Sequence, residues 1–462
     1  MIKDLLSARD LSLFTSGSRF SLARVFLREN MQDMEATFDL FVRELPSTRN
    51  YLVFGGLELV AEYLRNLRLD EQQLAWMRPK FHLDDAELRY FKNFHFSGDM
   101  FALPEGTIFF PNEPLIRITA PIIEAQIIEM FLINAVYLQT TLASKIARLY
   151  VAARGKDLAL GFNRSYGLDT AMKATRWSKI FDIKTSLAAY DYLMSNNPPF
   201  AVGTFHYLIM AFGNELDAFR AYLRQTQGKG YILVDTYDTI RGIRNFITAA
   251  KEVAKEGIQA TGIQLDSGDP YELSRRARKM LDEAGLYKAK IFAMGNLDEW
   301  KVADLERRKA PIDVYAGVTE ILTPTDAPTL ELVYKLSEIR QAKKITPKMK
   351  TSAKKVSLPG RKKVWRMSKG GRYTHDIIGT EDEKVDGQPL LVPIIKKGRF
   401  DYAYPALPHI HKYFDEQVQH FEPDLFSVDK KFVYSVKTGD QLQKLAATTK
   451  TEIEKQHFDK DL

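Results

Sequence analysis

The chain has 462 residues, which is enough for two or three domains with apolar cores. Its 66 basic and 59 acidic residues leave a net charge of +7, which suits anionic ligands without requiring nucleic acid. The absence of cysteine excludes disulfides, thiolate zinc sites and a cysteine nucleophile. No apolar run reaches the roughly 18 residues of a membrane span, and the first residues lack a secretory signal. We therefore expect a cytoplasmic protein with no membrane contact.

The first third of the chain is predicted to mix helices and strands. Ala36–Leu45 is rich in β-branched and aromatic residues and is predicted to be a strand. Two short strands are predicted within residues 106–119, and Pro121 favours the start of a long apolar helix. Helices are predicted over residues 1–35, 56–67, 71–77 and 122–152.

The middle of the chain alternates short apolar runs with stretches of helical periodicity. Residues 159–167 are predicted as a strand end and turn, and a second strand is predicted to end at His206, before a helix over 209–226. Four further strand-length runs follow at similar spacing: Tyr231–Val234, Ile258–Leu265, Lys290–Ala293 and Ile312–Ala316. Such alternation is typical of βαβ units and a parallel sheet. The fold class that we predict is α/β, with about six strands in an irregular barrel.

Polar residues gather just after these apolar runs. They are Asp235, Asp238, Asp266, Ser267, Asp269, Asn296 and Thr319. The carboxyl ends of parallel strands meet at one edge of a sheet, and ligands bind at that edge. For any single aspartate, helix capping is an equally good explanation: Asp269 precedes Pro270, and Glu272 occupies the capping-box position. The cluster is thus more informative than its members.

Residues 340–372 contain thirteen Lys or Arg residues and no Asp or Glu. A disordered basic arm of this kind would bind nucleic acid. Residues 356–360 and 364–367 have the character of ordered chain, and aromatic residues are not interleaved as a stacking platform needs. We therefore favour a solvated or phosphate-facing surface over nucleic-acid binding. His409 and His411 would share one face of a strand, but no third ligand lies nearby, and no metal site is predicted there.

Taken together, the motifs make the chain similar to one family, the nicotinate phosphoribosyltransferases. The resemblance spans nearly the whole length and depends on the order and spacing of the motifs. These include Glu35-Ala-Thr-Phe-Asp-Leu-Phe-Val, Leu103-Pro-Glu-Gly-Thr, Phe110-Pro-Asn-Glu-Pro-Leu, Gly203-Thr with His206, Leu233-Val-Asp235-Thr-Tyr-Asp238-Thr, Leu265-Asp-Ser-Gly-Asp269 and Leu358-Pro-Gly-Arg-Lys-Lys-Val-Trp-Arg366. The resemblance implies an irregular α/β barrel over 141–340, with an α+β domain formed by residues 1–140 and 341–462. It also implies a homodimer with shared active sites.

The resemblance further implies an activity and a set of site residues. The family joins nicotinate, a pyridine carboxylate, to phosphoribosyl diphosphate with Mg²⁺, and couples the reaction to ATP hydrolysis through a phosphorylated histidine. His206 and Asp266 match the catalytic positions. Phosphate binding is expected from Gly295, Asn296, Gly317 and Thr319, and substrate binding from Arg164, Phe162, Lys184, Thr185, Gln264 and Asp269.

Several positions depart from the family pattern. Ser18 stands near the place of a stacking tyrosine, and Leu160 stands where a stacking phenylalanine is usual. Asn163 and Gln264 replace arginines that pair with substrate anions, and an amide makes a weaker contact than a guanidinium. An alternative hypothesis is therefore an inactive homologue with a structural or regulatory role.

Overall fold

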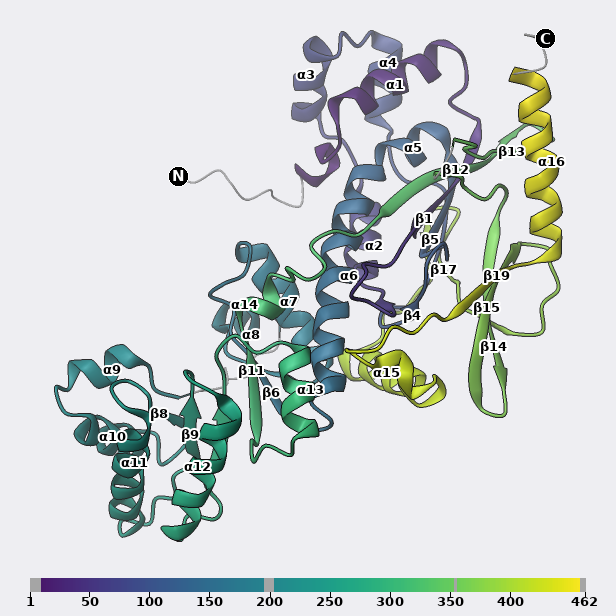
Figure 1. Ribbon diagram of the computed structural model, residues 1–462. Helices are drawn as coiled ribbons and strands as arrows, with labels where there is room; N and C mark the ends of the chain where they lie inside the picture. Colours follow the sequence, from purple (N-terminus) through teal and green to yellow (C-terminus); the bar gives the residue numbers. More distant parts are fainter. Residues whose placement is uncertain (1–9, 195–202, 353–354, 458–462) are drawn as a thin grey trace. The chain divides into compact units, whose positions relative to one another are not determined.

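The computed structural model describes residues 10–194, 203–352 and 355–457 (Figure 1). Within these residues the chain divides into two compact units. One unit, which we call the barrel domain, comprises Leu142–Pro328 and Val428–Lys430. The other, which we call the α+β domain, takes the described residues up to Thr141, Thr329–Ser427 and those from Lys431 onward.

The barrel domain is built on one sheet of six parallel strands in the order β7-β6-β11-β10-β9-β8. The strands are β6 (Asp157–Leu160), β7 (Lys184–Thr185), β8 (Tyr231–Leu233), β9 (Gly262–Leu265), β10 (Lys290–Ala293) and β11 (Val314–Gly317). Beyond β8, Gly203 forms a further parallel bridge to Tyr231. The sheet curls as a half-barrel, which confirms the predicted α/β barrel fold.

Helices connect these strands, and their apolar faces cover the sheet. They are α7 (Leu168–Ile180), α8 (Ala188–Met194), α9 (His206–Ala211), α10 (Glu215–Gln225), α11 (Thr239–Ala254), α12 (Pro270–Glu283), α13 (Glu299–Arg307) and α14 (Thr319–Leu322). In α11 the residues Ile243, Phe246, Ala250 and Val253 are all buried, as the helical spacing of apolar residues predicted. Within the sheet, Phe292 of β10 belongs to a small apolar cluster with Tyr231 of β8, Ala159 of β6, and Val314 and Ala316 of β11.

Two predicted helices are each divided in two. The helix predicted over 209–226 is broken because Gly213 has a φ of +67° and Asn214 caps a new helix by accepting from the backbone N–H of Leu216. His206 begins α9 and does not end a strand, and residues 200–202 of the predicted strand lie outside the described residues. Likewise, the helix over 122–152 is two helices, α5 (Ile122–Ile127) and α6 (Glu129–Ala152).

The α+β domain has a seven-stranded sheet in the order β13-β12-β1-β5-β3-β17-β18. The strands are β1 (Glu35–Val42), β3 (Asp99–Ala102), β5 (Ile116–Pro121), β12 (Leu332–Gln341), β13 (Lys344–Pro347), β17 (Val392–Lys396) and β18 (Arg399–Phe400). Strand β1 lies between β5 and β12 and is antiparallel to both. Both ends of the chain therefore supply strands to one sheet, which confirms the predicted second domain.

Smaller sheets and helices complete this domain. A four-stranded sheet has the order β16-β14-β15-β19, with bounds β14 (Lys362–Lys369), β15 (Arg372–Thr380), β16 (Gln388–Pro389) and β19 (Ser435–Thr438). Strands β2 (Leu52–Val53) and β4 (Ile108–Phe109) pair with each other. The remaining helices are η1 (Asp10–Leu13), α1 (Gly17–Arg28), α2 (Leu57–Asn66), α3 (Glu71–Lys80), α4 (Asp85–Lys92), α15 (Leu407–His420), η2 (Pro423–Phe426) and α16 (Asp440–His457).

The two histidines at 409 and 411 lie in helix α15, so the strand expected around them is wrong. Residues two apart on a helix point about 200° from each other, and they cannot share one face as they would on a strand. None of the described helices is long and apolar enough to span a bilayer.

The basic stretch 340–372 is partly a buried strand whose cations have acidic partners from elsewhere in the α+β domain. Lys362 Nζ lies 2.7 Å from Asp39 Oδ2, and Arg366 Nη2 lies 2.7 Å from Asp376 Oδ2. Arg361 Nε lies 2.9 Å from Glu338. Since these acids lie outside the stretch, the charges of these three cations are neutralised in the fold although the sequence around them is purely basic. This part of the stretch is therefore structural.

Candidate active site

The carboxyl edge of the parallel sheet gathers most of the polar residues expected to bind substrate. Strands β8, β9, β10 and β11 end at this edge, and the loops that follow them carry Asp235, Asp266, Gly295 and Thr319. Arg164 comes from the loop after β6. The parallel register aligns these ends because Leu233 pairs with Gln264 and Ala293 pairs with Leu265. Loops from five strands therefore open on one side of the barrel domain.

His206 lies at this edge and is fixed by a neighbouring hydroxyl. Its Nδ1 lies 3.1 Å from Oγ1 of Thr236, and its Nε2 lies 4.0 Å from Oδ2 of Asp266. The segment before His206 is held to β8 because the backbone N–H of Leu233 donates to Oγ1 of Thr204 at 2.8 Å. The ring is half exposed, with 45% of the side-chain surface accessible, so a ligand can reach it.

A second carboxylate, that of Asp235, acts on Asp266 beside His206. Burial raises the pKa of Asp266, and the charge of Asp235 raises it further, whereas His206 and Arg164 act in the opposite direction. Oδ2 of Asp235 accepts a 2.5 Å hydrogen bond from Ser267, and its buried Oδ1 has no hydrogen-bond partner. A buried carboxylate oxygen without a donor is costly, and a bound cation or a ligand hydroxyl would relieve that cost.

Arg164 joins the far side of the cluster to these acids. Its Nη1 lies 3.4 Å from Oγ1 of Thr319, the first residue of α14, and its charge lowers the pKa of Asp266. The pair Thr319–Arg164 and the pair Asp266–His206 therefore lie near each other, since the charge of Arg164 reaches Asp266. The structure brings together four of the residues that the sequence singled out.

The turn after β10 provides backbone groups to the same place. Gly295 has a φ of +90° and Asn296 a φ of +47°, and both residues are exposed. A Cβ on Gly295 would lie 2.1 Å from the backbone oxygen of Asp266, so only glycine lets the turn approach β9 this closely. The turn is held by Lys301, whose Nζ donates to the carbonyl of Asn296 at 2.6 Å. Gly317 ends β11 beside the turn that leads into α14.

Two of the expected substrate ligands have other partners. Asp269 caps α12, since its Oδ1 accepts from the backbone N–H of Tyr271 at 2.8 Å and of Glu272 at 3.4 Å. Asp238 caps α11 in the same way, through the N–H of Arg241. Lys184 lies at the amino end of β7, and its ammonium group is 2.6 Å from Asp157, the first residue of β6. Helix capping by Asp269 and Asp238, and ion pairing by Lys184, therefore account for the contacts that these three side chains make.

Other expected ligands are buried. Gln264 is 5% exposed, its Nε2 lies 2.6 Å from Sδ of Met294, and its Oε1 has no hydrogen-bond partner. Thr185 is 1% exposed and ends β7, and its hydroxyl also has no partner. Phe162 is half-buried in the loop after β6, near the exposed Asn163. Leu160 is buried at the end of β6.

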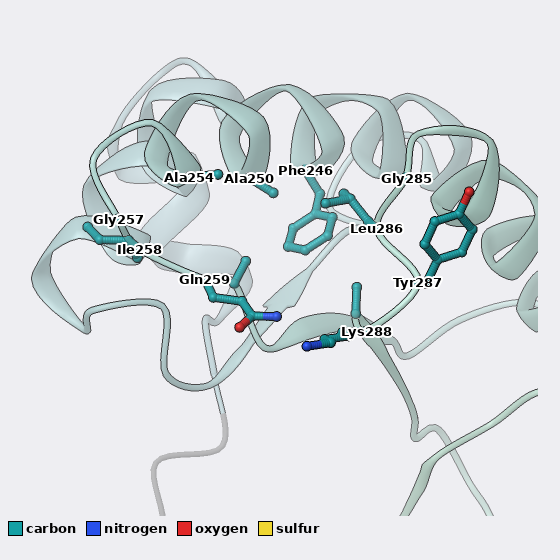
Figure 2. A pocket seen from close by; sticks show the side chains of 12 residues that line it. Phe246, Ala250, Ala254, Gly257, Ile258, Gln259, Gly285, Leu286, Tyr287 and Lys288 are labelled. Carbon is teal, nitrogen blue, oxygen red and sulfur yellow. The ribbon is translucent and has the colours of Figure 1, made fainter.

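A separate hollow of about 460 Å³ lies at the opposite edge of the sheet (Figure 2). Its walls are helix α11 and the loops that precede β9 and β10. Phe246 and Leu286 lie next to each other in this hollow, and no carboxylate lines it. It is therefore unsuited to a sugar phosphate with a metal, and we do not include it in the site.

Sequence reasoning missed Thr236 and a group of cations. Thr236 stands between Asp235 and Asp238, which drew attention as acids, and only the fold shows that its hydroxyl meets His206. In the α+β domain, burial lowers the pKa of Lys335; the charge of Glu129 opposes this shift, and those of Arg43, Lys350 and Lys355 add to it. The Nε of Arg43 is buried without a hydrogen-bond partner. The signal in the sequence was the basic stretch, but Arg43 lies far from it.

Comparisons with known proteins point to one family. A family model for the nicotinate phosphoribosyltransferase (NAPRTase) N-terminal domain matches residues 13–137. A nicotinate phosphoribosyltransferase of Mycobacterium tuberculosis is 38% identical over 437 residues, which cover 93% of this chain and 92% of that protein. One from Bacillus subtilis is 37% identical over 390 residues, covering 82% of this chain and 78% of the relative.

Solved structures show the same fold. The crystal structure of human nicotinic acid phosphoribosyltransferase has a TM-score of 0.80 at 21% identity, and the match covers 94% of this chain and 99% of the human one. A nicotinate-nucleotide pyrophosphorylase from Pyrococcus furiosus has a TM-score of 0.72 at 20% identity, with 91% and 98% covered. Sequence identity of 37–38% over most of the chain, together with the polar cluster at the sheet edge, leads to one conclusion: the chain belongs to the nicotinate phosphoribosyltransferase family.

Proposed function

We propose that this protein is a nicotinate phosphoribosyltransferase of NAD biosynthesis and salvage, which joins nicotinate to phosphoribosyl diphosphate. The observation that carries the proposal is the meeting of Arg164, His206, Asp266 and Thr319 at the carboxyl edge of the barrel sheet. Relatives with this activity in their names match over most of the chain. The reaction displaces diphosphate from the sugar carbon and needs cationic and hydrogen-bonding groups around the phosphates.

The residues divide into a sugar side and a phosphate side. The exposed turn Gly295-Asn296 and the start of α14 at Thr319 offer backbone N–H groups to a phosphate, as nests of backbone amides do in other proteins. Arg164 adds a guanidinium next to Thr319. Asp266 accepts hydrogen bonds from ribose hydroxyls. Nicotinate then attacks the anomeric carbon through its ring nitrogen as the bond to the diphosphate oxygen breaks.

Asp235 and Asp266 are the residues that would hold Mg²⁺. Among residues 10–194, 203–352 and 355–457, no three His, Cys, Asp or Glu side chains form a group that could hold a metal ion. Mg²⁺ commonly binds through one or two carboxylates together with substrate phosphates and water, and it does not need such a cage. The unpartnered Oδ1 of Asp235 and the mutual repulsion of the two acids fit this arrangement. When bound, the ion would neutralise charge on the leaving diphosphate.

His206 is proposed to carry the phosphoryl group that couples the reaction to ATP. When Nδ1 donates its proton to Thr236, Nε2 bears the free lone pair and can attack the γ-phosphorus of ATP. The bond from that phosphorus to the ADP oxygen breaks, and water later releases phosphate from the imidazole. Asp266 lies 4.0 Å from Nε2, close enough to interact electrostatically with a phosphoryl group on that nitrogen.

The α+β domain has a second candidate anion site in Arg43, Lys335, Lys350 and Lys355. The charges of Arg43, Lys350 and Lys355 lower the pKa of Lys335, while that of Glu129 opposes them, and a polyphosphate would reduce the repulsion among the four cations. The buried Nε of Arg43 still has a proton to donate. This agrees with a phosphate-facing role for the exposed part of the basic stretch.

A mononucleotide-formation assay tests the proposal. The protein would be incubated with phosphoribosyl diphosphate and Mg²⁺, and nicotinate, nicotinamide and quinolinate would be offered in parallel, with and without ATP. We expect product with nicotinate, stimulated by ATP in the wild type. The His206→Ala variant should lose the stimulation but keep the basal reaction, and Asp266→Asn should lose both. Failure of the wild type to form any mononucleotide, with no binding of phosphoribosyl diphosphate in calorimetry, would contradict the proposal and favour an inactive homologue.

A further inference from the structure

Helix α6 carries two buried cations in the part that belongs to the barrel domain. Lys145 and Arg148 are one helical turn apart and are 1% and 2% exposed. Both reach the carboxylate of Glu299, which is itself fully buried. Nζ of Lys145 lies 2.6 Å from Oε2 of Glu299, and Nε of Arg148 lies 2.9 Å from Oε1. Each oxygen of the carboxylate is thus held by a different cation.

Lys145 also contacts a second acid, and the chain positions of the two acids are informative. Its Nζ donates to Oδ1 of Asp326 at 2.8 Å. Glu299 begins α13, three residues after the turn Gly295-Asn296. Asp326 follows α14, whose first residue is Thr319. One ammonium group therefore joins the elements that directly follow the two candidate phosphate turns, and along the chain these turns are separated by α13 and β11.

The surroundings make this junction rigid. The ring of Trp300, next to Glu299, lies 4.9 Å from Nζ of Lys145 and 5.2 Å from Cζ of Arg148. The indole N–H donates to the carbonyl of Val428 at 2.8 Å. The ends of the turns are also fixed, since Asp298 caps α13 and Thr323 donates to the carbonyl of Thr319.

Buried ion pairs are seldom the most stabilising solution at a position, because well-packed apolar residues often do as well. What charged hydrogen bonds supply is direction: a carboxylate held at both oxygens has one position and one orientation. Two cations here pair with two carboxylates, so the network is neutral as a whole. Removal of one member would leave an uncompensated buried charge. The network therefore serves to fix the positions of Glu299 and Asp326.

We propose that Lys145, supported by Arg148, is a positioning residue that sets the distance between the phosphate turn at Gly295-Asn296 and the phosphate turn at Gly317–Thr319. This inference rests on the proposed function, since it assumes that both turns bind phosphoribosyl diphosphate. Neither cation touches the substrate. Both act through Glu299 and Asp326, and the property they govern is affinity for the sugar phosphate.

The test compares Lys145→Met, Asp326→Asn and the control Lys179→Met in the full-length protein. Lys179 pairs with the buried Asp191 at 3.0 Å in the same domain, but that pair links α7 to α8 and not the two turns. Calorimetry would measure binding of phosphoribosyl diphosphate with Mg²⁺, and steady-state kinetics would measure KM and kcat, at a temperature 10 °C or more below each variant's Tm. We expect about a tenfold rise in Kd and KM for phosphoribosyl diphosphate in Lys145→Met. KM for nicotinate should be unchanged and kcat should change less than threefold.

The outcomes separate the two proposals. Asp326→Asn should raise KM about threefold, because an amide keeps the contact but loses the charge, and it serves if Lys145→Met does not fold. Lys179→Met should lower Tm without changing KM. If Lys145→Met and Asp326→Asn bind phosphoribosyl diphosphate as the wild type does, the inference is wrong while the proposed function stands. If the wild type itself binds none, the proposed function fails and this inference fails with it.

Discussion

At the scale of single residues, Gly295 is a site position where the backbone leaves no room for a side chain. Its φ of +90° disfavours any side chain, and a Cβ would lie 2.1 Å from the carbonyl oxygen of Asp266. Replacement by alanine must therefore push the phosphate turn away from β9. We expect Gly295→Ala to lower the free energy of unfolding by about 2–4 kcal/mol and to abolish binding of phosphoribosyl diphosphate.

Gly257→Ala is the matched control for that variant. Gly257 has a φ of +81°, close to that of Gly295, but a Cβ there meets nothing within 4 Å. The strain of the left-handed conformation should lower the free energy of unfolding of Gly257→Ala by only about 1 kcal/mol. Binding of phosphoribosyl diphosphate should be normal. Urea unfolding and calorimetry measure both quantities. Equal effects in the two variants would show that the close approach to Asp266 is unimportant.

Thr236 should control the reactivity of His206. Its hydroxyl is the hydrogen-bond partner of Nδ1 and, in the proposed tautomer, accepts the Nδ1 proton; Thr236→Val removes the hydroxyl with little change in shape. We expect the rate of phosphoryl transfer from γ-labelled ATP to the protein to fall about tenfold, with Tm within a few degrees of the wild type. Thr248→Val is a suitable control because the Thr248 hydroxyl bonds only to its own helix, at the carbonyl of Arg244. Unchanged labelling in Thr236→Val would contradict the proposed tautomer.

At the scale of elements, some features were predictable and others were not. Asp269, Pro270 and Glu272 predicted the start of α12 because capping depends on neighbours in sequence. The break between α9 and α10 was missed because Gly213 is tolerated in many helices and only its φ reveals the turn. The role of the basic stretch was also out of reach: Asp39 and Lys362 pair across more than 300 positions, and local composition carries no trace of it.

The site was predictable to a similar degree. The rule that ligands meet the carboxyl ends of parallel strands correctly gathered Asp266, Thr319 and Gly295. The rule could not show which of these polar residues are already bound to another protein group and so are not available to a ligand. The carboxylate of Asp269 accepts from the backbone of α12, and the ammonium group of Lys184 pairs with Asp157. These choices depend on side-chain directions, which spacing along the sequence does not give.

A buried acid between strands and helix should make the α+β domain sensitive to pH. Glu113 is fully buried and accepts from the backbone N–H of Phe110. Burial raises the pKa of Glu113 well above its usual value, and the charge of Asp376 adds to this, while Arg366 opposes it. The folded state thus holds a proton on Glu113 at pH values where the unfolded chain has released it.

The free energy of unfolding should therefore fall as the pH rises from about 4.5 toward the folded-state pKa, by at most about 1.4 kcal/mol per pH unit. Glu113→Gln removes this titration, so its stability relative to the wild type should grow with pH. Urea unfolding at pH 5, 6, 7 and 8 measures the slope. The exposed Glu62→Gln is the control and should leave the slope unchanged. Parallel slopes for Glu113→Gln and the wild type would show that Glu113 is ionised in the folded state.

At the scale of the whole molecule, we predict a homodimer with shared active sites. The loops around the site and the helix starts that follow them expose large apolar side chains: Tyr166, Leu168, Phe205, Tyr207, Met210 and Tyr237. An exposed apolar group of this kind is typical of a surface that binds another protein. Sedimentation equilibrium should give twice the chain mass of 52.9 kDa.

Mixing inactive variants tests whether the sites are shared. Asp266→Asn lies in the barrel domain and Lys335→Met in the α+β domain, and each homodimer should be inactive. If one site draws on both chains, co-expression of the two variants should restore about a quarter of the wild-type activity per site. A monomeric mass, or a mixture as inactive as its components, would contradict the prediction.

The placement of β1 between β5 and β12 has a consequence for how the protein is made. The strand leaves the ribosome early, but its partner β12 is translated only after the whole of Leu142–Pro328. At about 5–20 residues per second the barrel domain has time to fold first, as an almost continuous segment. Meanwhile one hydrogen-bonding edge of β1 stays open to other nascent chains. Truncation by a premature stop before residue 332 should therefore yield aggregates, in which a folded barrel is attached to an amino-terminal segment whose β1 edge lacks β12.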